Sequence, residues 1–319
     1  MIPGSDRSGI ILVDKPEGMT SFAVVSRVRK ILNIKKAGHA GTLDPFATGL
    51  LVIAVGKATR VLRYMEHDSK VYRAVMELGR ITSTGDKEGE VIGGKMPDEA
   101  GLQALCEDDY RKVREAVMSM KGEITQVPSM YSAIKIAGRP AYDYARKGQE
   151  VKIPERKVTI HDITIGRISV VEGTVQVEMT VFCSKGTYIR TLCEDIGEKL
   201  GYGAYCLALR RIRSGGFSIE EAYTLEKIEE MERSGNSAFA KEEVEAMRSL
   251  PRIEVDEKEA GDLRNGKKLD FSSYKDRMGN VGADIGTRVL AMCGNEIVAV
   301  IYEEETEESI LIREERVFA

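Results

Sequence analysis

The strongest constraint on the fold is a pair of long strand-like runs that follow each other directly. Residues 158–171 and 174–183 are rich in β-branched and apolar residues, and only Glu172 and Gly173 separate them. A two-residue connection ending in glycine is typical of a tight β-hairpin, so the runs predict antiparallel neighbours in one sheet. Elsewhere, strand-like and helical segments alternate without a regular βαβ rhythm. We therefore expect an α+β fold on a mostly antiparallel sheet.

The other segments fit this class. Thr20 and Ser21 can cap a helix whose apolar face is formed by Phe22, Val25, Val28, Ile31 and Leu32. After about residue 250 the chain changes to short strand-like runs separated by glycine and asparagine turns, which predicts a small β-rich C-terminal domain. Strands are further expected at 9–13, 50–55, 71–78 and 204–212, and helices at 57–67, 109–120, 187–200 and 223–233.

Composition excludes several classes of protein. The 319 residues contain 42% hydrophobic residues but no apolar run long enough for a membrane span, and the N-terminus lacks the pattern of a secretory signal. Five cysteines without a C-x-x-C spacing indicate a reducing, cytoplasmic setting rather than a disulfide framework. With three histidines, none in a paired spacing, we expect no metal site.

The net charge of −4 hides a strong gradient. Residues 1–215 hold 33 Lys and Arg against 26 Asp and Glu, whereas residues 216–319 hold 14 against 25. Because phosphate binding depends on local groups of basic side chains, only the first two thirds of the chain is a candidate nucleic-acid surface. Ordinary variation of surface charge would produce the same imbalance.

A glycine-rich stretch, residues 38–51 (GHAGTLDPFATGLL), is the main candidate for chemistry. Its glycines allow the backbone to approach a ligand closely, and it carries His39 and Asp44, whose side chains suit proton transfer or nucleophilic attack. The spacing of a phosphate-binding P-loop is absent. Asp44 precedes Pro45, so it can equally cap a short helix, and the two roles are compatible.

Two further stretches combine basic and aromatic residues. Residues 128–147 interleave tyrosines with Lys and Arg, as in a surface that stacks bases and binds phosphates, although a tyrosine-rich loop packed on the core would look similar. In the second stretch, residues 185–192, Arg190 stands at the start of a predicted helix, where a positive charge is unfavourable. Arg190 therefore needs an anionic partner, and Asp44 is the simplest choice; such a pair would hold Asp44 ionised.

Four motifs, in order, resemble the TruB family of tRNA pseudouridine synthases. They are DKPEGMTS, AGHAGTLDPFATGLL, YSAIKIAGRPAYDYAR and KGTYIRTLCEDIG, and the resemblance runs from about residue 9 to residue 217. It implies a pseudouridine-synthase fold, an α+β domain around a mixed, mostly antiparallel central sheet. The catalytic domain would comprise residues 9–245, with an RNA-contacting segment at 123–157. Residues 246–319 would then be a small domain similar to the PUA module. Residues 93–115 look like a variable insertion.

The resemblance also implies roles for individual residues. Asp44 matches the catalytic aspartate, Tyr72 the active-site tyrosine that stacks on the base, and Arg190 the arginine that pairs with the aspartate. Leu209 matches a position lining the uracil pocket, and His39 the histidine that occupies the space of a flipped nucleotide. Further candidates for substrate binding are Lys15, which is expected to be more structural than chemical, and Tyr131, Ser132 and Lys135.

The implied activity is isomerisation of the T-loop uridine of tRNA (position 55 by tRNA convention) to pseudouridine, without a cofactor. The partner is the tRNA T stem-loop, no protein partner is expected, and nothing demands more than a monomer. The sequence leaves open whether Asp44 attacks the sugar or removes a proton. Three alternatives are a guide-RNA-dependent relative, an RNA-binding module without catalysis, and an aspartate-based hydrolase, which lacks a second carboxylate in any motif.

Overall fold

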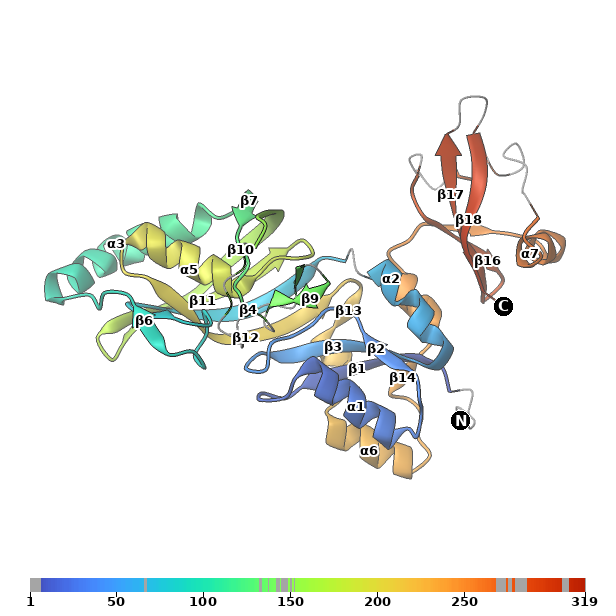
Figure 1. Ribbon diagram of the computed structural model, residues 1–319, viewed down its shortest axis with the longest axis horizontal. Coiled ribbons are helices and arrows are strands. Elements are labelled where there is room, and N and C mark those ends of the chain that lie inside the picture. The colour runs from blue at the N-terminus through green and yellow to red at the C-terminus, as the bar shows by residue number, and fades with distance from the viewer. Residues whose placement is uncertain are drawn as a thin grey trace. The chain divides into compact units, whose positions relative to one another are not determined.

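The computed structural model divides the chain into two compact units, Met1–Lys241 and Glu242–Ala319, which we describe separately. The boundary lies four residues before the one drawn from the sequence. The structure describes residues 7–65, 68–131, 134–136, 138–141, 144, 149, 151, 153–267, 274, 277–278, 286–305 and 310–318. Figure 1 shows the elements of both units.

One large sheet forms the frame of the first unit. Its strands lie in the order β14-β1-β3-β12-β4-β11-β10-β7, with β2 on β3 and β13 on β12, and β3 and β12 run parallel while the other pairs are antiparallel. The predicted mixed, mostly antiparallel sheet is thereby confirmed. The strands are β1 Gly9–Lys15, β2 Ala37–His39, β3 Thr48–Val55, β4 Lys70–Leu78, β7 Gly122–Gln126, β10 Arg156–Val171, β11 Thr174–Cys183, β12 Ala204–Ser214, β13 Phe217–Ser218 and β14 Ala240–Lys241.

Helices α1, α3, α5 and α6 share one hydrophobic core with the strands of this sheet. Across β3, β12, β4 and β11 the successive register partners are Gly49, Arg211, Tyr72 and Val181, so their side-chain positions share one face of the sheet. α6 packs on β1 beside α1, whereas α5 packs on β12 and β4 beside α3. The helical elements are α1 Ser21–Ile31, η2 Gly56–Val61, α2 Leu62–Met65, α3 Glu99–Met118, α5 Ile189–Leu200, η3 Ile219–Glu221 and α6 Leu225–Arg233.

Two helices differ from their sequence-based prediction. In α1 the predicted cap Thr20 accepts a hydrogen bond from the Ala23 amide, but the buried face is Ser21, Val24, Val25 and Val28, and Phe22 is 72% exposed. Apolar character alone therefore misplaced Phe22, since Ser21 takes the inward position. α3 begins ten residues earlier than expected and is interrupted at Glu107–Tyr110, where three residues adopt positive φ.

The hairpin that anchored the prediction is present. β10 and β11 pair from Ile160↔Cys183 to Val171↔Thr174, and Glu172 and Gly173 both have positive φ, as a tight two-residue turn requires. Two short ribbons complete the first unit, β5 Ile81–Thr82 with β6 Val91–Gly93 and β8 Lys135–Ile136 with β9 Arg139–Pro140.

The second unit is small and β-rich. Its sheet has the order β15-β16-β17-β18, with β15 Arg252–Glu254 parallel to β16 Val289–Cys293 and the remaining pairs, β17 Glu296–Glu305 and β18 Ile310–Val317, antiparallel. A short helix, α7 Glu257–Arg264, packs on this sheet, and η4 Glu243–Met247 precedes it. The two units have separate hydrophobic cores. No helix in the described part of the chain combines the length and apolar character needed to cross a bilayer.

The burial pattern of α1 gives a direct test of the fold. Val28→Ala removes two buried methyl groups, so we expect the free energy of unfolding to fall by roughly 1.5–2.5 kcal/mol. Phe22→Ala on the same helix should change it by less than about 0.5 kcal/mol, because Phe22 faces solvent. Urea unfolding followed by circular dichroism measures both; an equal loss in the two variants would contradict the orientation of α1.

Candidate active site

The loop that carries Asp44 connects β2 to β3 over the middle of the sheet. β3 begins at Thr48, directly after the loop, and its second residue Gly49 has φ of 101° and pairs with Arg211 on the parallel strand β12. A Cβ atom at Gly49 would lie 2.3 Å from the carbonyl oxygen of Arg211, so a side chain there would separate the two strands. Gly49 thus allows β3 to pair closely with β12, and this pairing fixes where the loop ends.

The first motif holds this loop from behind. The buried Ser21 hydroxyl donates to the Leu43 carbonyl at 3.0 Å and accepts from the Leu43 amide at 2.8 Å. The Lys15 ammonium, also buried, donates to the carbonyl oxygens of Pro16, Met19 and Pro45 at 2.9, 2.6 and 3.0 Å. Burial lowers the pKa of Lys15 to about 8. Backbone bonds on both sides of Asp44 therefore restrain its position.

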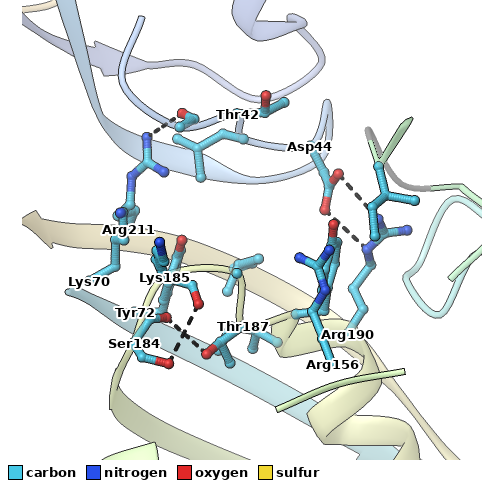
Figure 2. A pocket seen from close by; sticks show the side chains of 17 residues that line it. Thr42, Asp44, Lys70, Tyr72, Arg156, Ser184, Lys185, Thr187, Arg190 and Arg211 are labelled. Atoms are coloured by element: carbon cyan, nitrogen blue, oxygen red, sulfur yellow. Dashed lines mark hydrogen bonds and ion pairs between the residues drawn. The ribbon is translucent and has the colours of Figure 1, made fainter. Parts of the chain in front are cut away.

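Arg190, the second residue of α5, binds the Asp44 carboxylate with two nitrogens. Nε lies 3.0 Å from Oδ2 and Nη2 lies 3.2 Å from Oδ1. The predicted pair is therefore present (Figure 2). The Arg190 side chain is only 4% exposed, and it also donates to Asp86 Oδ2 at 3.2 Å and to the carbonyls of Thr84 and Tyr131 at 2.6 and 3.1 Å. One guanidinium thus fixes two carboxylates and two loops.

Asp86, in the turn between β5 and β6, was not identified from the sequence. Its carboxylate accepts from the Thr84 hydroxyl at 2.6 Å and from the Glu88 amide at 3.0 Å. The turn is tied to β12 because the Cys206 amide donates to the Gly85 carbonyl at 2.9 Å. Asp86 lies far from the other motifs in sequence and has the ordinary appearance of a turn residue, so no local signal separates it from other turn aspartates.

Burial and charge act against each other at Asp44. Burial raises the pKa of the Asp44 carboxyl above its usual value, and the charge of Asp86 adds to the increase. The charge and hydrogen bond of Arg190 lower it, as the sequence predicted, but burial is the larger effect. Asp44 is therefore a carboxylate in a partly dry setting, with 31% of its side chain exposed to a neighbouring cavity.

That cavity has a volume of about 550 Å³. Four of the predicted site residues meet in its wall: Asp44, Tyr72, Arg190 and Leu209. Asp44 is the sole carboxylate among the described residues that line it. The basic side chains of this lining are Lys70, Arg156, Lys185, Arg190 and Arg211. An anionic polymer that places a neutral ring inside suits this arrangement.

Arg211 is a further site residue that the sequence analysis did not assign. It is fully buried, and its guanidinium donates to the carbonyls of Leu50 at 2.7 Å and Gly41 at 3.1 Å. Burial raises the pKa of Tyr72, whereas Arg211 opposes that shift. Tyr72 therefore keeps its hydroxyl proton at neutral pH. Burial and Arg211 together lower the pKa values of Lys70 and His39.

Three further predicted residues, His39, Lys15 and Tyr131, are not among the residues that line the cavity. His39 is the last residue of β2, paired with Ile53, and Lys15 lies behind the loop. Tyr131 contributes its carbonyl to Arg190, and its ring is exposed. Lys135 is the first residue of β8, and only its backbone is described. Ser132 lies outside the described residues. Within the described ranges, no three His, Cys, Asp or Glu residues are grouped so as to hold a metal ion.

Comparison with known sequences decides the family. The family model described as TruB family pseudouridylate synthase (N terminal domain) matches residues 29–189, and the tRNA pseudouridylate synthase B C-terminal domain matches residues 190–253. The chain belongs to the TruB family of pseudouridine synthases. The resemblance seen in the four motifs is confirmed, and with it the expected enzyme class, an isomerase that forms pseudouridine in tRNA.

Individual relatives agree with this assignment. The tRNA pseudouridine synthase B of Streptococcus thermophilus is 42% identical over 286 residues, covering 89% of this chain and 94% of the relative. That of Syntrophotalea carbinolica is 45% identical over 248 residues, covering 78% and 77%. Among solved structures, a chain of an H/ACA RNP bound to a substrate RNA containing 2'-deoxyuridine is 26% identical with a TM-score of 0.70, covering 98% of this chain and 85% of that chain. A chain of a Cbf5-Nop10-Gar1 complex is 28% identical with a TM-score of 0.70, again covering 98% of this chain and 85% of that chain. These structural matches confirm the fold.

The two hydrogen bonds between the Ser21 hydroxyl and the Leu43 backbone form a clamp on the loop that carries Asp44. Loss of this clamp should slow the catalysed reaction. Ser21→Ala removes both hydrogen bonds to the loop, so we expect the single-turnover rate to fall about 10- to 100-fold through misplacement of Asp44. Thr20→Ala, which removes the neighbouring helix cap, should cost about 1 kcal/mol of stability and leave the rate unchanged. Rapid-quench assays with saturating RNA compare the two; a Ser21→Ala enzyme that is less stable but equally fast would show that the clamp does not position Asp44.

Proposed function

We propose that this enzyme isomerises the T-loop uridine of tRNA, at position 55 by tRNA convention, with Asp44 as its essential residue. The observation that carries the proposal is the placement of the Asp44 carboxylate, bound by two nitrogens of Arg190, in the wall of a cavity that also contains Tyr72 and Leu209. The cavity volume of about 550 Å³ is ample for one nucleoside.

In the reaction the bond from N1 of uracil to C1′ of ribose breaks, a bond from C5 to C1′ forms, and the proton of C5 is lost while N1 gains one. No electrons or groups are exchanged with another molecule, so the reaction needs no cofactor. An ionised Asp44 acts either as the nucleophile at the sugar or as the base that removes a proton. Both routes use the carboxylate that Arg190 orients.

The uridine must leave the stacked T-loop to reach Asp44, at a cost of a few kcal/mol. Stacking on Tyr72 would offset part of this cost, at about 1–3 kcal/mol per aromatic contact. Leu209 supplies an apolar wall for the ring. His39, whose pKa is lowered by burial so that its ring is neutral, would occupy the position that the extruded nucleotide leaves.

Further parts of the proposal concern the whole chain. Residues 9–245 form the catalytic domain, with 123–157 as an RNA-contacting segment, and residues 246–319 form a PUA-like domain. The enzyme acts as a monomer in the cytoplasm, on tRNA alone. The 42–45% identity to curated tRNA enzymes, against 26–28% to the RNP chains, favours this over a guide-dependent activity.

The main test uses unmodified tRNA transcript, without protein partners and with EDTA present. We expect one pseudouridine, at the T-loop uridine, when the product is mapped by chemical labelling and reverse transcription. Asp44→Asn should abolish product formation but retain RNA affinity, because the cationic cavity wall remains. Modification at another site would reject the substrate, dependence on an added guide RNA would favour the alternative, and an active Asp44→Asn enzyme would reject the catalytic role.

The effect of Asp86 on the pKa of Asp44 predicts a change in the pH dependence of the reaction. Asp86 raises that pKa, so Asp86→Asn should lower it and move the acid limb of kcat/KM to lower pH, since Asp44 then stays ionised in more acidic solution. Glu90→Gln, an exposed charge change in the same β5–β6 connection, should leave the acid limb in place. An acid limb that stays fixed or moves to higher pH in Asp86→Asn would contradict the assignment of this limb to Asp44.

A further inference from the structure

Three basic side chains in the described part of the cavity wall have their charge directed to protein oxygens. Arg190 binds Asp44 and Asp86, and Arg211 binds two backbone carbonyls. The Lys70 ammonium donates to the carbonyl of Asp68 at 2.5 Å. These cations hold the site together, so they have limited capacity to bind a further anion.

Arg156 differs from them. It is the first residue of β10, and its Nε is buried without a hydrogen-bond partner in the described part of the chain. Its guanidinium carbon lies 5.5 Å from the centre of the Tyr188 ring, a cation–π contact that does not use the Nε donor. Figure 2 shows Arg156 entering the cavity from the same side as Arg190, with Arg211 and Lys70 on the opposite side of the view.

The backbone next to Arg156 leaves room for this placement. Gly186 has φ of 78°, and a Cβ atom there would lie 3.1 Å from Nη1 of Arg156. The turn is held by its own hydroxyls, since Thr187 donates to the Ser184 carbonyl at 2.9 Å and Ser184 accepts from the Thr159 amide at 2.9 Å. The glycine of the KGTY motif thus allows the guanidinium to lie against the turn.

The N-terminus of α5 adds positive potential at the same place. Tyr188, at its N-cap, makes no side-chain capping bond, and the first turn contains no acidic residue. Lys185 lines the same wall. A guanidinium with an unused buried donor, a lysine and an uncapped helix start together favour an anion.

We propose that Arg156 is the phosphate-binding residue of the catalytic cavity and that it binds the phosphodiester adjoining the uridine that enters it. The inference rests on the proposed function, in which one nucleotide leaves the RNA stack. Uracil carries no charge, so the phosphate is the group of that nucleotide that matches a guanidinium with an unused buried donor. Arg156 is in this sense a positioning residue, because it sets where the ribose lies relative to Asp44.

The first experiment measures RNA affinity against salt concentration. In Arg156→Ala we expect the dissociation constant of a T stem-loop to rise roughly tenfold or more. The slope of log K against log salt should become shallower by about 0.7–1, since one phosphate contact is lost. Arg156→Lys should restore most of the slope, and Arg167→Ala, an exposed arginine farther along β10, should behave as wild type. The single-turnover rate at saturating RNA should fall less than the affinity.

A second experiment removes the charge from the RNA instead. A methylphosphonate is placed at the 5′ or the 3′ phosphate of the target uridine, and binding is measured with wild type, Arg156→Lys and Arg156→Ala. At one of the two positions the loss of affinity should be large in wild type and absent in Arg156→Ala. If Arg156→Ala fails to fold, Arg156→Gln replaces it in this combination of protein and RNA substitutions.

The outcomes separate the two proposals. The phosphate contact would be overturned if, at both phosphates, the losses of affinity caused by the methylphosphonate and by Arg156→Ala were additive. An unchanged salt slope in Arg156→Ala would overturn it as well. A lower single-turnover rate with an unchanged slope would also overturn it and would indicate contact with uracil. If wild type formed no pseudouridine in the T-loop, the proposed function would fail regardless of Arg156.

Discussion

A single buried guanidinium organises the first unit. Arg190 meets two carboxylates and two backbone carbonyls, and these partners come from three separate parts of the chain. A buried arginine without partners would be strongly destabilising, so the site cannot lose one carboxylate without cost to the fold. The same interaction that satisfies Arg190 also orients the oxygen atoms of Asp44. Stability and catalytic geometry therefore depend on the same contacts.

The site is built mainly from polar groups that are buried behind it. Lys15, Ser21 and Arg211 all bind backbone atoms of the loop that holds Asp44 or of the strand that follows it. Hydrogen bonds of this kind fix a loop more tightly than apolar packing, because each donor has few alternative partners. The loop is thus rigid on its inner side and presents Asp44 on its outer side.

Sequence patterns specified the frame more fully than the site. The hairpin at Glu172 and Gly173 was predictable because two adjacent residues determine its turn, and the Asp44–Arg190 pair because an arginine at a helix start needs an anion. Phe22 was misplaced because periodicity does not show which of several apolar faces meets the core. Asp86 and Arg211 were missed because their roles come from neighbours in space. No pattern along the chain encodes such neighbours.

The distance between these partners along the chain has a consequence for biosynthesis. Asp44 and Arg190 are 146 positions apart, and Asp86 and Arg190 are 104. During translation both acidic groups emerge long before the arginine, so they remain hydrated and mutually repulsive until α5 is made. Closing loops of this length is slow and comes late in folding. A nascent or truncated chain therefore has no competent site, and catalytic competence reports that the first unit is complete.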